Sequence, residues 1–323
     1  MASSMCASTR LSLSSSLRTN LSSPRTSRAP LISLRVSPIF QALSFKSVRT
    51  NFKNPISASA SASASASASA RMAGQNKKIE KFETEEEVAV RLAKYTADLS
   101  AKFVKERGAF TVVLSGGSLI DALRKLAEAP YKDSVDWSKW HVFWVDERVV
   151  KRDHVDSNYK LALDGFLCKV PIPLGQVYGI NDALSAEAAA DDYETCLKHL
   201  VQRNVIATSK TTGFPKFDLM LLGMGPDGHL ASLFPGHPLV NEKNKWVTCI
   251  KDSPKPPPER ITFTFPVINS AAYNAMVVTG EGKASAVCTA LGNSQHSETL
   301  PAQLLSAEDE LTWFLDKSAA LNL

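Results

Sequence analysis

The sequence predicts an α/β protein with a Rossmann-like, doubly wound and mostly parallel sheet that is flanked by helices. Short apolar segments typical of strands alternate with longer segments whose apolar residues recur at helical spacing. Such alternation indicates crossover units and parallel strands. Polar, glycine-containing clusters also follow several strand segments, and ligands of such sheets bind beyond the carboxyl ends of the strands.

The elements are expected in alternating order along the chain. Residues 84–107 should form the first helix, because Thr84 and Glu87 have the spacing of a capping box. Strands are expected at 110–114, 140–145, 217–222, 246–250, 261–265 and 275–278. A helical pattern follows residue 118, and further helices are expected at 155–167, 183–205, 283–291 and 307–315.

The N-terminal part of the chain has a different composition. Residues 1–79 contain no Asp or Glu but eleven Lys or Arg and many Ser, which is typical of an organelle transit peptide. Residues 57–70 are Ser-Ala repeats that cannot form a core. We therefore expect a transit peptide and disordered linker over residues 1–72 and a single domain over 73–323. The Met-Ala-Ser-Ser start favours a plastid (chloroplast stroma) over a mitochondrion.

The charge balance depends on this leader. The whole chain has a formal charge of +5, whereas beyond residue 79 there are 26 basic and 32 acidic residues, a net charge of −6. A nucleic-acid or membrane-surface partner is therefore not expected. The alternative, a basic arm that binds nucleic acid, is weak because its charges are widely spaced and few aromatic residues accompany them. No apolar run approaches the ~20 residues that span a bilayer.

Cysteine usage indicates neither a disulfide framework nor a metal site. Four cysteines follow the leader, without Cys-x-x-Cys or His-x-x-x-His spacing. They are expected to be reduced core residues, with no metal and no cofactor. No sustained heptad pattern is present, so a monomer is expected.

The turn Ser115-Gly116-Gly117-Ser118 joins a predicted strand to a helical pattern. Paired glycines let the backbone approach a ligand, and N–H groups at a helix start attract anions. The sequence favours a phosphate-binding turn here, and the alternative is a plain tight turn.

Residues 223–228 match Gly-x-Gly-x-x-Gly, a pattern typical of dinucleotide-binding sites. In that interpretation Asp252 would be the ribose-binding acid. Two features oppose that interpretation. The helix expected next is interrupted by Pro235 after barely two turns, and Asp227 would face a pyrophosphate. The segment is better explained by a catalytic pair in which Asp227 fixes the tautomer of His229. The alternative is a structural histidine.

Asp146-Glu147-Arg148 follows another predicted strand. Arg148 is suited to bind a phosphate or to stabilise an oxyanion. The alternative is a helix-start cap with a surface ion pair. Arg260 and Lys283 are further candidate phosphate cations.

In chain order these motifs resemble those of the 6-phosphogluconolactonases, from about residue 78 to residue 315. The matching segments are 114–118, 144–148, 156–159, 223–232, 258–262, 280–283 and 300–302. The resemblance implies the α/β fold of the glucosamine/galactosamine-6-phosphate isomerase superfamily. It also implies hydrolysis of 6-phospho-D-glucono-1,5-lactone to 6-phospho-D-gluconate in the oxidative pentose phosphate pathway, without a metal.

The same resemblance implies roles for individual residues. Gly116, Gly117 and Ser118 would hold the phosphate, with Arg260 and Lys283 as its cations.

Four further residues would complete the site. His229 would activate water as the general base, and Asp227 would hold its ring. Arg148 would contact phosphate or substrate oxygens, and Asp146 is a further substrate-binding candidate.

Two rival functions stay open. A deaminase or isomerase of the same superfamily would carry Glu five residues after the histidine, where this sequence has Phe234. A non-catalytic sugar-phosphate sensor would keep the phosphate turn but lose its base, whereas Asp227 and His229 are both present.

Overall fold

The computed structural model describes residues 76–292 and 299–323. The predicted transit peptide and Ser-Ala linker lie outside the described residues. Six parallel strands form the main sheet, in the order β1 (Lys77–Phe82), β11 (Glu310–Asp316), β10 (Tyr273–Val278), β7 (Leu219–Gly223), β2 (Phe110–Leu114) and β3 (Trp140–Trp144). The predicted α/β fold with a mostly parallel sheet is confirmed.

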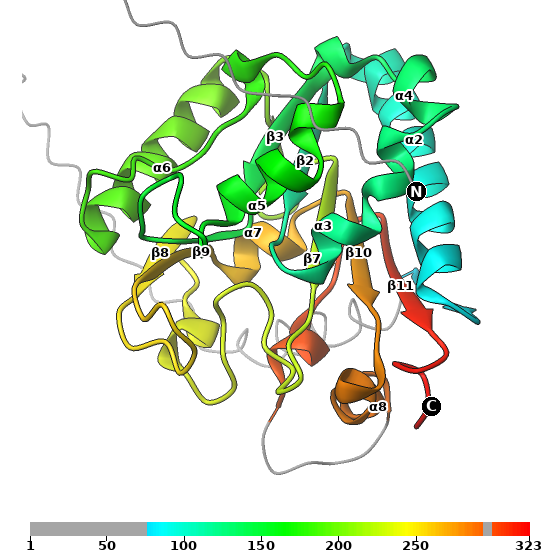
Figure 1. The fold of residues 1–323 in the computed structure, drawn as a ribbon. Helices are drawn as coiled ribbons and strands as arrows, with labels where there is room; N and C mark the ends of the chain where they lie inside the picture. The colour runs from blue at the N-terminus through cyan, green and yellow to red at the C-terminus, as the bar shows by residue number, and fades with distance from the viewer. Residues whose placement is uncertain (1–75, 293–298) are drawn as a thin grey trace, which may run out of the picture. The chain divides into compact units, whose positions relative to one another are not determined.

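Helices cover both faces of this sheet (Figure 1). One face packs against α2 (Glu85–Arg107), α3 (Ser118–Ala122) and α5 (Asn158–Gly165), and the other against α6 (Ala186–Gln202), α7 (Phe265–Asn269) and α8 (Ala284–Leu291). Successive strand residues point to opposite faces, so Val112 and Leu114 join the α2 side while Val113 joins the α6 side.

Short elements connect these layers. They are α4 (Tyr131–Ser134) and the 3-10 turns η2 (Arg124–Ala127), η3 (Trp137–Lys139), η4 (Leu167–Lys169), η5 (Leu174–Gln176), η6 (Pro238–Asn241), η7 (Glu281–Lys283) and η8 (Pro301–Leu304).

The start of α2 shows the predicted capping. The Thr84 hydroxyl accepts a hydrogen bond from the Glu87 N–H at 3.2 Å, and the Glu87 carboxylate accepts from the Glu83 N–H at 2.9 Å. The first bond satisfies an N–H group that the helix start leaves without a helical partner. The second reaches the residue before the N-cap, in place of the Thr84 N–H of a capping box. Gly108 then ends the helix in the left-handed region, with φ of 73°.

Five of the described strands lie outside the parallel sheet. β4 (Asp146–Arg148), β9 (Arg260–Phe263) and β8 (Val247–Ile250) form an antiparallel sheet, and β5 (Ala207–Thr208) pairs with β6 (Pro215–Lys216). β8 and β9 were predicted as strands, but they do not extend the main sheet. β4 pairs Arg148 with Arg260, so two cations far apart in the sequence become neighbours.

The predicted helix over 307–315 is wrong, because β11 occupies most of that range. Its residues Leu311–Leu315 are buried on both faces of the sheet, as expected for an interior parallel strand. β1, the mostly exposed neighbouring edge strand, was not predicted. The short helix expected after His229 is also absent, since residues 229–237 form turns and isolated bridges.

The order of the strands determines where a ligand can bind. From β2 the chain adds β3 on one side, then returns to add β7, β10 and β11 on the other side. Such a reversal leaves a crevice at the carboxyl ends of the strands. The segments 115–118 and 223–229 leave β2 and β7 at this point.

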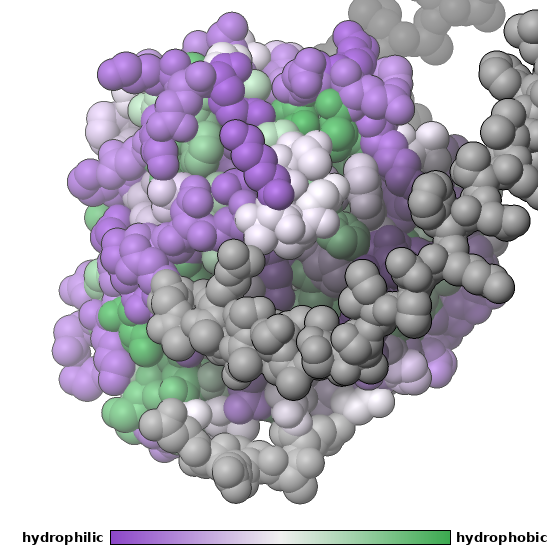
Figure 2. All heavy atoms as spheres, turned by 180° about the vertical axis from the view of Figure 1, so that it is seen from behind, coloured by the Kyte–Doolittle hydropathy of each residue, from purple (hydrophilic) through white to green (hydrophobic). Residues whose placement is uncertain are grey.

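The surface is largely hydrophilic, with small apolar areas, on the face that Figure 2 shows outside the grey atoms. Among the described residues, none of the helices has the length and apolar character needed to cross a membrane.

Candidate active site

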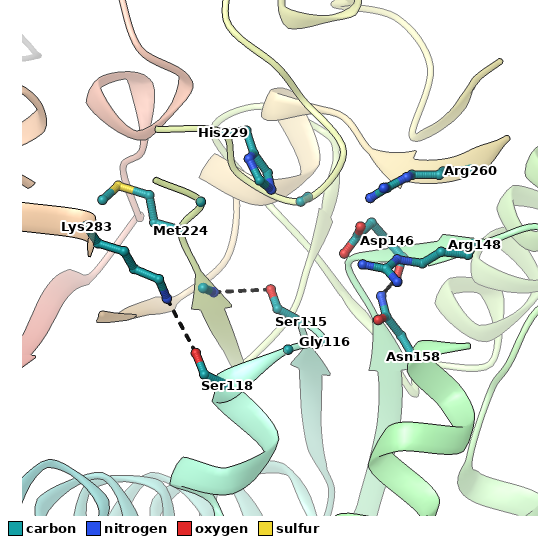
Figure 3. Close-up of a pocket in the computed structure, with 14 residues that line it drawn as sticks. Ser115, Gly116, Ser118, Asp146, Arg148, Asn158, Met224, His229, Arg260 and Lys283 are labelled. Carbon is teal, nitrogen blue, oxygen red and sulfur yellow. Dashed lines mark hydrogen bonds between the residues drawn. The ribbon is translucent and has the colours of Figure 1, made fainter. Parts of the chain in front are cut away.

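A pocket of about 140 Å³ lies at the carboxyl ends of β2, β3, β7 and β10 (Figure 3). That volume is roughly ten times what one water molecule requires. The residues that line it are Ser115, Gly116, Gly117, Ser118, Asp146, Arg148, Asn158, Gly223, Met224, Gly225, His229, Ala231, Arg260 and Lys283. The polar clusters that follow four predicted strands therefore converge on one site.

The turn after β2 is shaped by close contacts. A Cβ on Gly116 would lie 1.9 Å from Oδ1 of Asn158, so only glycine fits beside that amide. Gly117 has φ of 67°, which favours glycine, and Ser115 accepts a hydrogen bond from the Gly223 N–H at 3.3 Å. That bond fixes the β2 turn to the end of β7.

Lys283 supplies the cation of this wall. Its ammonium group donates to the Ser118 hydroxyl at 3.4 Å, and Figure 3 shows both side chains on the same side of the pocket. Burial lowers the pKa of Lys283. A partly desolvated ammonium beside a glycine turn is well suited to bind an anion.

A second cationic group occupies the opposite wall (Figure 3). Arg148 donates from Nη1 to the Asp156 carbonyl at 3.0 Å, while its buried Nε has no hydrogen-bond partner among the described residues. The Asp146 carboxylate accepts from the Ser232 hydroxyl at 2.8 Å, and its carbonyl accepts from the Asn158 amide at 3.0 Å. The Nε of Arg148 is thus a buried donor whose hydrogen bond no described residue accepts.

The guanidinium of Arg260 is held rigidly. Its Nε donates to the Pro257 carbonyl at 2.9 Å, and its Nη2 donates to the carbonyls of Lys255 and Pro256 at 2.7 and 3.0 Å. Burial, and secondly the neighbouring charge of Arg148, lower the pKa of Arg260. Two adjacent guanidinium groups indicate that this wall also attracts an anion or a polarised oxygen.

Glu147 points away from this pocket and serves the helix behind it. Its carboxylate accepts from the N–H groups of Arg148, Asn158 and Tyr159 at 2.7–2.8 Å, at the start of α5. The helix-cap alternative therefore applies to Glu147, whereas Asp146 and Arg148 line the pocket. Burial raises the pKa of Glu147 to about 7.

His229 lies across the pocket from the β2 turn. Its Nδ1 lies 2.5 Å from Oδ1 of Asp227, and its ring packs on the buried Phe234, with centroids 4.7 Å apart. Burial lowers the pKa of His229, whereas Asp227 acts in the opposite direction. Burial acts to raise the pKa of Asp227, but hydrogen bonds from His229 and Lys255 outweigh it and lower that pKa. The two lowered pKa values favour a neutral imidazole beside an ionised carboxylate.

Two glycines of this segment have no room for a side chain, and one of them lies against the pair. A Cβ on Gly225 would lie 2.1 Å from the His229 ring and 2.6 Å from the Asp227 carboxylate. Gly228 has φ of 77°, and its Cβ would lie 2.7 Å from the side chain of Leu300. Of the three glycines that match the dinucleotide pattern, Gly225 makes room for His229, whereas a Cβ on Gly223 would meet no atom within 4 Å. Asp252, the candidate ribose acid, pairs with His237 at 3.3 Å.

Most predicted site residues lie in this pocket. Its lining includes Gly116, Gly117, Ser118, Asp146, Arg148, His229, Arg260 and Lys283, while Asp227 lies behind the imidazole. Arg260 and Lys283, predicted as cations of one phosphate, stand on opposite walls.

Sequence reasoning gave no role to Asn158 or Lys255, and it placed Ser115 only within the phosphate-binding turn. Asn158 lies in one of the motifs that carried the family resemblance, which is the signal that could have found it. Lys255 lies in none.

No group of His, Cys, Asp and Glu side chains within residues 76–292 and 299–323 is arranged to hold a metal ion. The four cysteines of this part are free, and Cys168 is exposed, so its expected core position is wrong.

The comparisons with known proteins agree with this fold. The family model described as glucosamine-6-phosphate isomerases/6-phosphogluconolactonase matches residues 83–313, and the chain belongs to this family. The Oryza sativa subsp. indica protein named "Probable 6-phosphogluconolactonase 4, chloroplastic" is 76% identical over 240 residues, 74% of each chain. The Arabidopsis thaliana protein named "6-phosphogluconolactonase 3, chloroplastic" is 62% identical over 284 residues, 88% of this chain and 87% of that one.

A solved structure extends the likeness beyond plants. The 6-phosphogluconolactonase of Trypanosoma brucei superposes with a TM-score of 0.67 at 25% identity, over 77% of this chain and 100% of that chain.

Proposed function

We propose that this protein is a plastid 6-phosphogluconolactonase, which hydrolyses 6-phospho-D-glucono-1,5-lactone to 6-phospho-D-gluconate in the oxidative pentose phosphate pathway. Its high identity to relatives named as chloroplastic 6-phosphogluconolactonases supports both the activity and the compartment. The observation that carries the proposed mechanism is the Asp227–His229 pair, which faces a cationic, glycine-lined pocket. The leader over residues 1–72 is proposed as the plastid address.

In this mechanism His229 is the general base. With Nδ1–H donated to Asp227, the Nε2 lone pair accepts a proton from water, and the water oxygen attacks the lactone carbonyl carbon. The tetrahedral intermediate collapses as the bond to the ring oxygen breaks, and the imidazolium returns its proton to that leaving oxygen. The lactone is an activated ester, so this sequence needs no covalent nucleophile.

The cations of the two walls have separate tasks in this proposal. Lys283, Ser118 and the turn Gly116–Gly117 bind the phosphate, which fixes the ring ester beside the base. Arg148, which lines the pocket, contacts the developing oxyanion or a phosphate oxygen, and Arg260 adds positive charge beside it. Asp146 accepts a hydrogen bond from a substrate hydroxyl.

The deaminase alternative loses support at Phe234. This side chain is 2% exposed and packs against the His229 ring, so the position offers packing but no proton relay. The sensor alternative makes one different prediction, which is binding without turnover.

The test uses the purified full-length protein. Acid release should be rapid with the 6-phosphorylated lactone and slower by about tenfold or more with unphosphorylated glucono-1,5-lactone, since a charge-assisted contact is lost. Glucosamine 6-phosphate should release no ammonia. Binding of 6-phosphogluconate without any lactone turnover would instead identify a sensor and contradict the proposal.

A further inference from the structure

A third charged group contacts the Asp227–His229 pair from behind. Lys255 lies in the segment 251–259 that joins β8 to β9, outside the lining of the pocket. Its Nζ is 3.1 Å from Oδ1 of Asp227 and 3.3 Å from Nδ1 of His229. The same carboxylate oxygen therefore faces both the ammonium group and the imidazole.

The donors and acceptors of this triangle fix where the ring proton lies. An ammonium group offers only donors, and a carboxylate only acceptors. If Nδ1 of His229 carried no proton, two acceptor atoms would face each other across 2.5 Å. With the proton on Nδ1, the Asp227 oxygen accepts from both neighbours, and Nε2 keeps its lone pair toward the pocket.

We propose that Lys255 is a positioning residue for the general base, because its amine holds Asp227 ionised and oriented so that His229 keeps the Nδ1–H tautomer. The proposal rests on the proposed function of His229. It adds a residue that does not touch the substrate and whose amine acts through the pair.

The backbone of the same loop supports a linked role. The Lys255 carbonyl accepts from Arg260 at 2.7 Å and from the Ser253 hydroxyl at 2.8 Å, and the Lys255 N–H also approaches that hydroxyl at 3.2 Å. One residue thus positions Arg260 through its carbonyl and the pair through its amine. The loop sets the separation between base and cation.

The charges that face His229 act in opposite directions. The imidazole is surrounded by Asp227, Lys255 and Asp146, and the two carboxylates raise its pKa while Lys255 lowers it. Without the amine, burial is the remaining cause that lowers this pKa, and the carboxylates that raise it lose one opposing charge. The imidazole would then be protonated, and inactive as a base, at higher pH.

The test compares the pH dependence of kcat/KM in the wild-type enzyme with Lys255→Met and Lys255→Arg. The acid-side midpoint should move to higher pH by on the order of one unit in Lys255→Met. Lys255→Arg keeps a cationic donor, so its midpoint should stay close to that of the wild-type enzyme. Lys251→Met is the matched control, because Lys251 belongs to the same loop but pairs with Glu187. Its profile should equal that of the wild type.

A second readout does not depend on activity. The ¹⁵N shifts of the His229 imidazole, assigned with a His229→Gln sample, should report protonated Nδ1 in the wild type and a tautomer mixture in Lys255→Met. An unchanged pH midpoint with unchanged tautomer in Lys255→Met overturns the proposal. So does a KM increase at every pH without a shifted midpoint, which would mark a substrate-binding lysine. Full activity of His229→Gln would instead reject the proposed function itself.

Discussion

Oδ1 of Asp227 lies 2.5 Å from Nδ1 of His229, and the imidazole stands between this carboxylate and the pocket. The contact joins two residues that are separated only by Gly228. It directs one ring nitrogen at the carboxylate, and in the proposed mechanism the other faces the substrate. The first two predictions concern this pair, and the third concerns Lys283.

Asp227→Asn should lower kcat by about 100-fold or more, because the amide no longer selects the Nδ1–H tautomer. The pH dependence has a defined sign. Asp227 raises the pKa of His229, so its neutralisation should move the acid-side midpoint of kcat/KM to lower pH. Rate measurements across pH test both effects. A midpoint that moves upward, or a wild-type kcat, would contradict the role given to Asp227.

Gly225→Ala should displace the base without unfolding the protein. The added Cβ would lie 2.1 Å from the His229 ring, so the ring must move, and kcat should fall by about 100-fold. Gly175→Ala is the control, because its Cβ would meet no atom within 4 Å. Thermal unfolding should show both variants folded. Retained activity in Gly225→Ala would show that the ring position is not required.

Lys283→Met should chiefly weaken substrate binding. Loss of a charge-assisted contact with phosphate should raise KM by about tenfold to a hundredfold with a smaller change in kcat. The preference for the phosphorylated lactone over the unphosphorylated one should shrink by the same factor. Lys317→Met, which removes an exposed lysine paired with Glu83, should change neither quantity. If Lys283→Met kept the wild-type preference for the phosphorylated lactone, the phosphate would have to bind at the Arg148–Arg260 wall instead.

Glu147 should make stability depend on pH. Burial raises its pKa from 4.5 to about 7, so between these values the folded protein holds a proton that the unfolded chain has released. The free energy of unfolding should therefore decrease as pH rises through this window. Glu147→Gln should lack this component of the slope. Urea unfolding of both proteins between these two pH values measures how the free energy of unfolding depends on pH. Equal slopes for the two proteins would contradict the raised pKa of Glu147.

The sequence predicted those parts of the fold that local patterns determine. β2, β3, β7 and β10 are apolar runs that end in polar turns, and the Thr84–Glu87 capping is a local signal. β11 was predicted as a helix, because a strand buried on both faces has no alternation of polar and apolar residues that distinguishes it from a buried helix. β1 is polar, and its place in the sheet depends on pairing with β11, which lies more than 200 residues away.

The site was predictable where motifs lie at strand ends, and not where long-range pairing creates it. The pairing of Arg148 with Arg260 depends on the antiparallel sheet of β4 and β9, which no local pattern signals. The contact of Lys255 with Asp227 likewise depends on the path of a loop. The fit of Gly116 against Asn158 depends on how α5 packs beside the β2 turn.

In the proposed mechanism His229 activates the attacking water. The most direct test is acid release from 6-phospho-D-glucono-1,5-lactone by His229→Gln and by the wild-type enzyme, after subtraction of the spontaneous hydrolysis. We expect kcat to fall by about 100-fold to 10,000-fold in the variant while 6-phosphogluconate still binds. Equal rates in the two proteins would contradict it.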